Sequence, residues 1–241
     1  MRKVIATAVI AVAAAGPAFA ADMPFYPPII DIPDVNHGVS GNFYLRGSAA
    51  WNTLWAREVF HPTATPTTYA IEENGYGYSV GAGFGYETGT GLRVDATIDY
   101  LSNDNMTATT TTGGGALTAG RHSLKLRSTV ALANAYYDFS FGDFGYGAAG
   151  GAFGYVGAGA GIAFNDVVVT GPGPADRNGQ NTSFAAAGMV GAGYDFGQIV
   201  ADLGYRALYI DKLENSGATA PYSIASNWVH EVRGTVRYRF N

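Results

Sequence analysis

Cysteine is absent from the 241 residues, charged residues make up only 14% of them, and basic residues nowhere form a cluster. The absence of cysteine excludes disulfide bonds, thiol catalysis and zinc sites built on cysteine. The 14 basic residues are outnumbered by 19 acidic ones, so the chain has no electrostatic basis for binding nucleic acid. His37, His61 and His122 lack the spacing of a metal site, and we predict no metal and no other cofactor.

Residues 1–20 have the pattern of a secretory signal peptide. Arg2 and Lys3 precede an uncharged run, and Ala18-Phe19-Ala20 forms a cleavage site. The alternative is a membrane anchor, but the apolar run is shorter than the roughly 20 residues that a spanning helix needs. Cleavage would leave 12 basic against 19 acidic residues and a formal charge of −7. We therefore predict an exported, acidic protein.

Glycine and aromatic residues are abundant, with 34 Gly, 16 Tyr and 13 Phe. This composition suits thin strands with aromatic girdles better than it suits a helical core. Residues 21–41 carry several prolines and little periodicity, so they are predicted to form an extended periplasmic leader. From residue 42 to residue 241 the chain repeats one pattern, an alternating segment followed by a connection.

The last segment, residues 228–240, shows the alternation most clearly. Non-polar residues and His230 occupy the even positions, whereas polar residues and Val229 occupy the odd positions. A strict period of two is typical of a β-strand. This strand is longer than the usual five or six residues, which together with its aromatic end indicates a transmembrane strand.

Seven further segments show the same pattern. They cover residues 43–52, 76–87, 92–100, a stretch that begins at Leu124, and residues 153–164, 183–196 and 199–209. Long polar connections (53–75, 102–122, 165–182 and 210–226) alternate with short ones (88–91, 140–145 and 197–198). The sequence therefore predicts an all-β protein, a single eight-stranded antiparallel up-and-down transmembrane β-barrel over residues 42–241 in the bacterial outer membrane.

The polar positions of these strands would point into the barrel. An eight-stranded barrel is only wide enough to be filled by its own side chains, so its interior charges must pair with one another or with water. The predicted lumen ion-pair network consists of Arg46, Glu87, Arg93, Asp95, Asp99, Lys125, Arg127, Asp195, Asp202, Arg206, Glu231, Arg233, Arg237 and Arg239.

The fourth segment is ambiguous. Leu124, Leu126, Val130 and Leu132 alternate with Lys125, Arg127 and Thr129, but Asn134 and Asp138 then fall on the apolar positions. Either these two residues lie at the membrane interface, or a β-bulge shifts the register.

The chain also resembles a family, the small outer-membrane β-barrel proteins of alphaproteobacteria (the Omp25/Omp31-like group of the OmpA-like barrel superfamily). The resemblance rests on the order of four short motifs: 42–47 (NFYLRG), 134–139 (NAYYDF), 155–159 (YVGAG), and 230–233 (HEVR) continuing to 237–240 (RYRF). It implies insertion by the outer-membrane assembly machinery, for which Tyr238 and Phe240 would be the signal, and a porin-family surface antigen without catalytic residues. Asn241 departs from the pattern by following Phe240.

Three other motifs have alternative interpretations. His230, with Ser226 nearby, could serve a lipid A-modifying enzyme on the outer wall, but Glu231 would point away from it. The spacing of Gly145, Gly147 and Gly150 matches a dinucleotide fingerprint, which needs a parallel strand and a helix that a barrel does not supply. The glycine-rich run 144–165 could be a packed membrane helix, although glycine disfavours helices by about 1 kcal/mol per residue.

We therefore predict a non-enzymatic, monomeric envelope protein that contacts outer-membrane lipid and lipopolysaccharide and presents surface loops. The alternatives are a narrow porin-like diffusion channel and, less favoured by the residues, a lipid A-modifying enzyme.

Overall fold

The computed structural model describes residues 41–55, 58–60, 69–110, 118–141, 151–173, 178–214 and 223–240. The predicted signal peptide, residues 1–20, and all of the predicted leader except Gly41 lie outside these ranges, as does the fingerprint at 145–150. Over the described ranges, no helix has the length and apolar character needed to cross a membrane.

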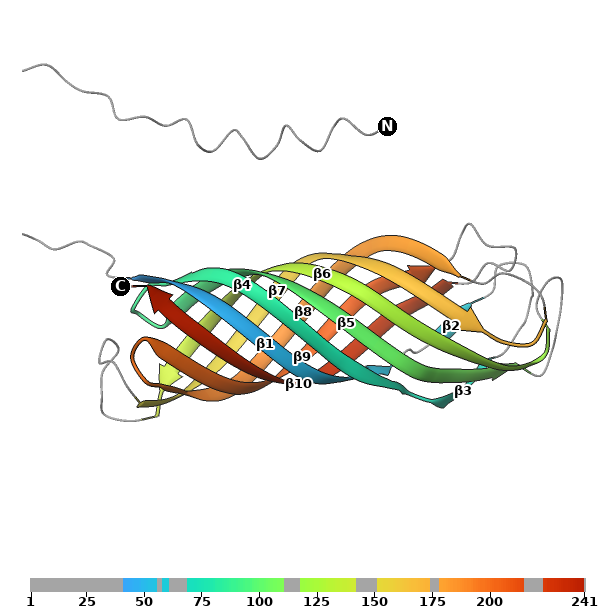
Figure 1. The fold of residues 1–241 in the computed structure, drawn as a ribbon, viewed down its shortest axis with the longest axis horizontal. Coiled ribbons are helices and arrows are strands. Elements are labelled where there is room, and N and C mark those ends of the chain that lie inside the picture. The colour runs from blue at the N-terminus through green and yellow to red at the C-terminus, as the bar shows by residue number, and fades with distance from the viewer. Residues whose placement is uncertain are drawn as a thin grey trace, which may run out of the picture. The chain divides into compact units, whose positions relative to one another are not determined.

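Ten β-strands are present in the described residues: β1 (Asn42–Trp55), β2 (Glu58–Phe60), β3 (Tyr69–Glu73), β4 (Gly75–Glu87), β5 (Leu92–Thr110), β6 (Gly120–Ser140), β7 (Gly151–Thr170), β8 (Gly179–Asp195), β9 (Ile199–Glu214) and β10 (Ser223–Phe240). Eight of them form a closed antiparallel ring in the order β1, β4, β5, β6, β7, β8, β9, β10, with β10 pairing back onto β1 (Figure 1). The short strands β2 and β3 pair with β10 and β5. The predicted eight-stranded up-and-down barrel is confirmed, and β7 excludes a helix at residues 151–165.

Closure of the ring is continuous along β1 from its second residue to its last. Its pairing with β10 runs from Phe43 opposite Phe240 to Trp55 opposite Trp228. At one end of the barrel, which we call the turn end, tight turns join β4 to β5 and β8 to β9. Gly89, Gly91 and Gly197 adopt positive φ there, a conformation that glycine reaches without strain. We call the opposite end the loop end.

Side chains alternate between the outside and the inside of the barrel as the pleat requires. On β5, for example, Ile98 is 63% exposed and the adjacent Asp99 only 1%. On β1, β4, β5 and β10 the outward residues are those predicted to face lipid.

The prediction for β6 was wrong over its first half. Every even-numbered residue from His122 to Tyr136 is buried inside the barrel, including Leu124 and Leu126, whereas Lys125 is exposed on the outer wall. Lys125 and Arg127 therefore do not belong to the lumen network. Asn134 lies inside the barrel and not at the membrane interface. Pairing of β6 with β7 is unbroken from Ser123 to Ser140. A β-bulge between these two strands therefore does not explain the polar residue at position 134 either.

The strands also extend further into the predicted long connections than expected. β5, β6 and β7 have 19, 21 and 20 residues, about twice the 9 to 11 that a tilted strand needs to cross a bilayer. The predicted strand ends were placed where outward apolar residues stop. The alternation continues beyond that point with the opposite sense, apolar inside and polar outside.

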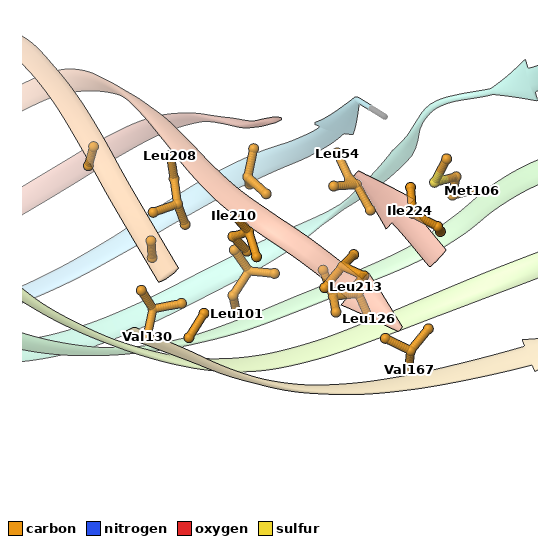
Figure 2. Close-up of a cluster of buried hydrophobic side chains, with 14 of the residues drawn as sticks. Leu54, Leu101, Met106, Leu126, Val130, Val167, Leu208, Ile210, Leu213 and Ile224 are labelled. Carbon is orange, nitrogen blue, oxygen red and sulfur yellow. The ribbon is translucent and has the colours of Figure 1, made fainter. Parts of the chain in front are cut away.

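The interior of the loop end is consequently an apolar core, which we call the apolar tier (Figure 2). It contains Leu54, Leu101, Met106, Leu124, Leu126, Val130, Leu132, Ala163, Val167, Ala185, Ala187, Leu208, Ile210, Leu213, Ile224 and Val229. These side chains are supplied by β1, β5, β6, β7, β8, β9 and β10, so they hold the barrel wall together from within. Burial of each large side chain contributes about 1.5 to 3 kcal/mol.

Candidate functional site

The interior between the apolar tier and the turn end holds the charges, and we call this part the charged tier. Its members are Arg46, Glu87, Arg93, Asp95, Asp99, Asp138, Asp195, Asp202, Arg206, Glu231, Arg233, Arg237 and Arg239. Twelve of these residues were predicted from the alternation. Asp138 was missed, because the positions assigned to lipid on β6 are those that face inward.

Four charges form a closed quartet next to the apolar tier. Arg206 from β9 donates to Asp99 at 2.7 Å and to Glu231 at 2.6 Å. Arg233 from β10 donates to the same two carboxylates at 2.6 and 2.9 Å. Ser79 also donates to Glu231, at 2.8 Å. Each carboxylate thus has two arginine partners, which compensates the cost of removing these charges from water.

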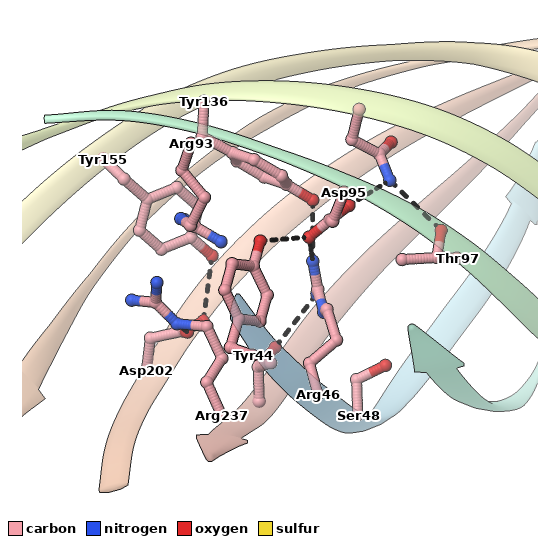
Figure 3. A network of polar contacts seen from close by, with 12 residues as sticks. Tyr44, Arg46, Ser48, Arg93, Asp95, Thr97, Tyr136, Tyr155, Asp202 and Arg237 are labelled. Atoms are coloured by element: carbon pink, nitrogen blue, oxygen red, sulfur yellow. Dashed lines mark hydrogen bonds and ion pairs between the residues drawn. The ribbon is translucent and has the colours of Figure 1, made fainter. Parts of the chain in front are cut away.

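A second cluster surrounds Asp95, closer to the turn end (Figure 3). Asp95 accepts hydrogen bonds from Arg46 at 2.8 Å, from the Tyr44 hydroxyl at 2.9 Å and from the Asn134 amide at 2.8 Å. Arg46 also donates to the hydroxyl of Tyr136 at 2.8 Å. Asn134 is therefore a structural partner of the network, which accounts for a polar residue at a position predicted to be apolar.

The third cluster joins arginines to carboxylates and aromatic rings. Arg93 binds Asp138 through two nitrogens, at 3.1 and 3.0 Å, and its guanidinium lies 4.0 Å from the centre of the Tyr136 ring. Arg237 lies 3.5 Å from Glu87 and 3.8 Å from Asp202. Stacking on a ring face adds to the ion pairs for such a delocalised cation.

Arg239 closes the charged tier at the turn end. It forms ion pairs with Glu87 and, at 2.6 Å, with Asp195, and it donates to the carbonyl of Gly197 at 2.8 Å. This contact ties the end of β10 to the turn between β8 and β9.

Glycines on the barrel wall make room for the large interior side chains. A Cβ atom at Gly157 would overlap the ring of Tyr136, one at Gly159 would overlap Asn134, and one at Gly204 would overlap Tyr155. These glycines are thus needed where the interior is most crowded.

The charged tier is a network of ion pairs. Each of its carboxylates has an arginine within ion-pair distance, so none is held as an unpaired base. Within the described ranges, no three His, Asp or Glu side chains are grouped so that they could hold a metal ion.

The proposed enzyme residues lie elsewhere, on the outer wall. The Nδ1 atom of His230 is 2.5 Å from the hydroxyl of Tyr205, and the two rings are stacked with centroids 6.0 Å apart. Glu231 points into the lumen, where Arg206 and Arg233 bind it, so it does not orient the imidazole. The nearby Ser226 has a positive φ of 56°.

The outer wall has two aromatic girdles with an apolar belt between them. Exposed rings near the loop end are Trp51, Trp55, Tyr76, Tyr78, Tyr100, Phe164 and Phe184, and those near the turn end are Phe43, Phe139, Phe141, Tyr194, Phe196, Tyr238 and Phe240. Tyr238 and Phe240, the predicted assembly signal, pack edge to face at 5.4 Å in the second girdle. Their reading by assembly machinery stays a prediction.

A closed ring satisfies every strand edge within the barrel, which is the condition for β-structure to span lipid. The apolar belt and its girdles complete the features of the small outer-membrane β-barrel proteins. The fold and the outer wall therefore define a protein of this class, located in the bacterial outer membrane.

Several solved structures are similar to this chain, each at low sequence identity. Neisserial surface protein A (NspA) is 20% identical, with a TM-score of 0.48 over 82% of this chain and 97% of that one. Ail of Yersinia pestis is 13% identical, with a TM-score of 0.38 over 82% and 98%. The outer membrane protein AlkL, solved in lipid bilayers, is 14% identical, with a TM-score of 0.42 over 94% and 97%. No family model and no curated protein matches the sequence.

Proposed function

We propose that the protein is a non-enzymatic, monomeric outer-membrane protein that stabilises the cell envelope and presents its loop end to the outside. We also propose that it is related to the alphaproteobacterial Omp25/Omp31-like proteins, on the basis of the motifs at 42–47, 134–139, 155–159 and 230–240. Insertion would depend on the outer-membrane assembly machinery, and the partners would be outer-membrane lipid and lipopolysaccharide.

One observation carries the proposal: the interior of the barrel is occupied along its length by two tiers of packed side chains. Asp99, Glu231 and their two arginines join β5, β9 and β10 inside the barrel, beside the apolar tier. Beyond them lie fully buried side chains such as Leu101, Leu126 and Leu208. A filled interior favours a scaffold.

A narrow diffusion channel is the second candidate. Ions would have to pass the quartet and then an apolar layer, and the layer raises the cost of desolvating each ion. The apolar tier therefore argues against conduction.

Recordings in planar bilayers test the choice between scaffold and channel. The full-length folded protein should give no reproducible single-channel steps under conditions in which a general porin, added to the same bilayers, conducts. Reproducible steps that depend on protein concentration would overturn the scaffold and favour the channel.

The enzyme alternative has its own test. Lipid A from cells with and without the protein should show the same acyl pattern by mass spectrometry, because His230 lies beside Tyr205 with its Nδ1 engaged. A change in acylation that a His230→Ala variant abolishes would contradict the proposal.

A further inference from the structure

A polar groove of about 640 Å³ crosses the outer wall on β5, β6, β7 and β8. Its lining includes Tyr100, Arg127, Phe164, Asp166, Gln180 and Thr182. Grooves of this size are in the range of small-molecule sites, roughly 300 to 1,000 Å³.

The height of the groove is set by the girdle. Tyr100 and Phe164 belong to the aromatic girdle at the loop end, and each pairs in register with Thr129 of β6. Aromatic girdles lie at the level of lipid headgroups. The groove therefore extends from the edge of the hydrocarbon region into the headgroup layer.

One basic side chain, Arg127, lines the groove, and a second, Lys125, lies beside it. Arg127 is anchored by Asp104 at 2.9 and 3.2 Å and by the carbonyls of Asn103 and Leu126. Lys125 is exposed on the same wall two residues away, and it forms no ion pair with another described residue. Side chains two residues apart on one face of a strand are separated by about 7 Å, so both cations can reach one phosphate.

Two carboxylates, Asp104 and Asp166, equal the two cations in formal charge, but they are held differently. Asp104 is engaged by Arg127, and Asp166 is 3.5 Å from the amide nitrogen of Gln180. Lys125 pairs in register with Val168 of β7, which brings no charge. Lys125 is thus the cation that no described carboxylate pairs, and it lies at the rim of the groove, two residues from Arg127 and next to amide and hydroxyl groups suited to sugar hydroxyls.

We propose that this groove binds the phosphorylated sugar headgroup of an outer-leaflet glycolipid of the lipid A type. Lys125 and Arg127 contact the phosphate, Gln180 and Thr182 contact sugar hydroxyls, and Tyr100 and Phe164 pack against the start of the acyl chains. The proposal rests on the outer-membrane role proposed above and gives one lipid contact a specific site.

Native mass spectrometry of the full-length protein in phosphatidylcholine nanodiscs that contain lipid A tests the site. The unaltered protein should retain one lipid A molecule. Charge-assisted contacts to phosphate are strong, so the K125Q/R127Q variant should retain about tenfold less, and the single K125Q variant should also lose retention. Lys212→Gln is the matched control, because Lys212 is exposed on the wall but already paired with Glu214, and its retention should be unchanged.

The choice of lipid identifies the ligand. Lipid A stripped of its phosphates should be retained as weakly as lipid A is by K125Q/R127Q. Equal retention by all variants would overturn the site, and so would equally strong retention of phosphatidylglycerol, which would assign the groove to phospholipid. The Lys125 side chain forms no ion pair with a described residue, so the K125Q variant keeps the test valid even if the double variant misfolds. Channel recordings do not involve this groove, so the two proposals fail separately.

Discussion

Asp99 illustrates how a single residue determines the interior of this barrel. Its side chain is 1% exposed and is held between Arg206 and Arg233. Buried ion pairs of this kind add little to stability compared with an apolar core, but the loss of one partner leaves an uncompensated buried charge. The quartet therefore acts as a unit.

Asp99→Asn should destabilise the barrel strongly. The substitution leaves two arginines sharing Glu231, and we expect a loss of about 3 to 5 kcal/mol in the free energy of unfolding. Urea titration of the protein folded in lipid vesicles measures the change. In the control Glu214→Gln, whose partner Lys212 is exposed, the loss should be about 0 to 1 kcal/mol; equal losses for both variants would contradict the quartet.

At the same scale, most of the charged tier could be predicted because alternation alone assigns a side chain to a face. The rule failed for Lys125, Arg127 and Asp138 because it assumed that apolar residues face outward everywhere. Which arginine binds which carboxylate could not be predicted, because the pairing depends on strand stagger: Arg233 and Asp99 are 134 residues apart in sequence.

β6 shows at the scale of the element what the alternation means. Its even positions face inward from His122 to Asp138, but they change from apolar (Leu124, Leu126) to polar (Asn134, Asp138) as the strand passes from the loop end to the turn end. The outer positions change in the opposite direction, because the wall passes from water into lipid. The alternation of a strand thus depends on two things: which side chains face outward, and whether lipid or water lies outside the wall at that height.

A bulge in β5 adjusts the strand as it enters the loop end. Pairing with β6 shifts between Asn103 and Met106, and Asn105 adopts a positive φ of 65°. Asn103 and Met106 are both buried, so the bulge changes which parity faces inward. Asparagine tolerates this conformation, but no sequence signal distinguished it from the surrounding polar residues.

Adjacent valines on β7 provide a matched test of the apolar tier. Val167 is 0% exposed inside the barrel, whereas Val168 is 38% exposed on the wall. Val167→Ala should cost roughly 2 kcal/mol of unfolding free energy through lost burial and the cavity left behind, and Val168→Ala about 0.5 kcal/mol or less. Urea titration of both variants decides, and the reverse order would show that the loop end is not packed as described.

As a whole, the molecule is a barrel whose inner and outer surfaces each have two environments. We expect lipid to surround the charged tier and water to surround the part of the wall that encloses the apolar tier. The ring of eight strands could be predicted from the sequence, because eight segments alternate and their connections are long and short in turn. The height of the barrel above the membrane could not be predicted from the sequence, because the predicted strands ended at the girdle of the loop end.

The most direct test of this account is a spin-label scan along β6. The chain has no cysteine, so single cysteines from 121 to 139 can each carry a unique label in lipid nanodiscs, and accessibility to oxygen and to a water-soluble relaxing agent can be compared. We predict that labels at 133, 135 and 137 contact lipid, that labels at 121, 125 and 127 contact water, and that labels at 124, 126 and 132 are shielded from both. Shielded labels at 125 and 127 with lipid-exposed labels at 124 and 126 would contradict the two-tier barrel.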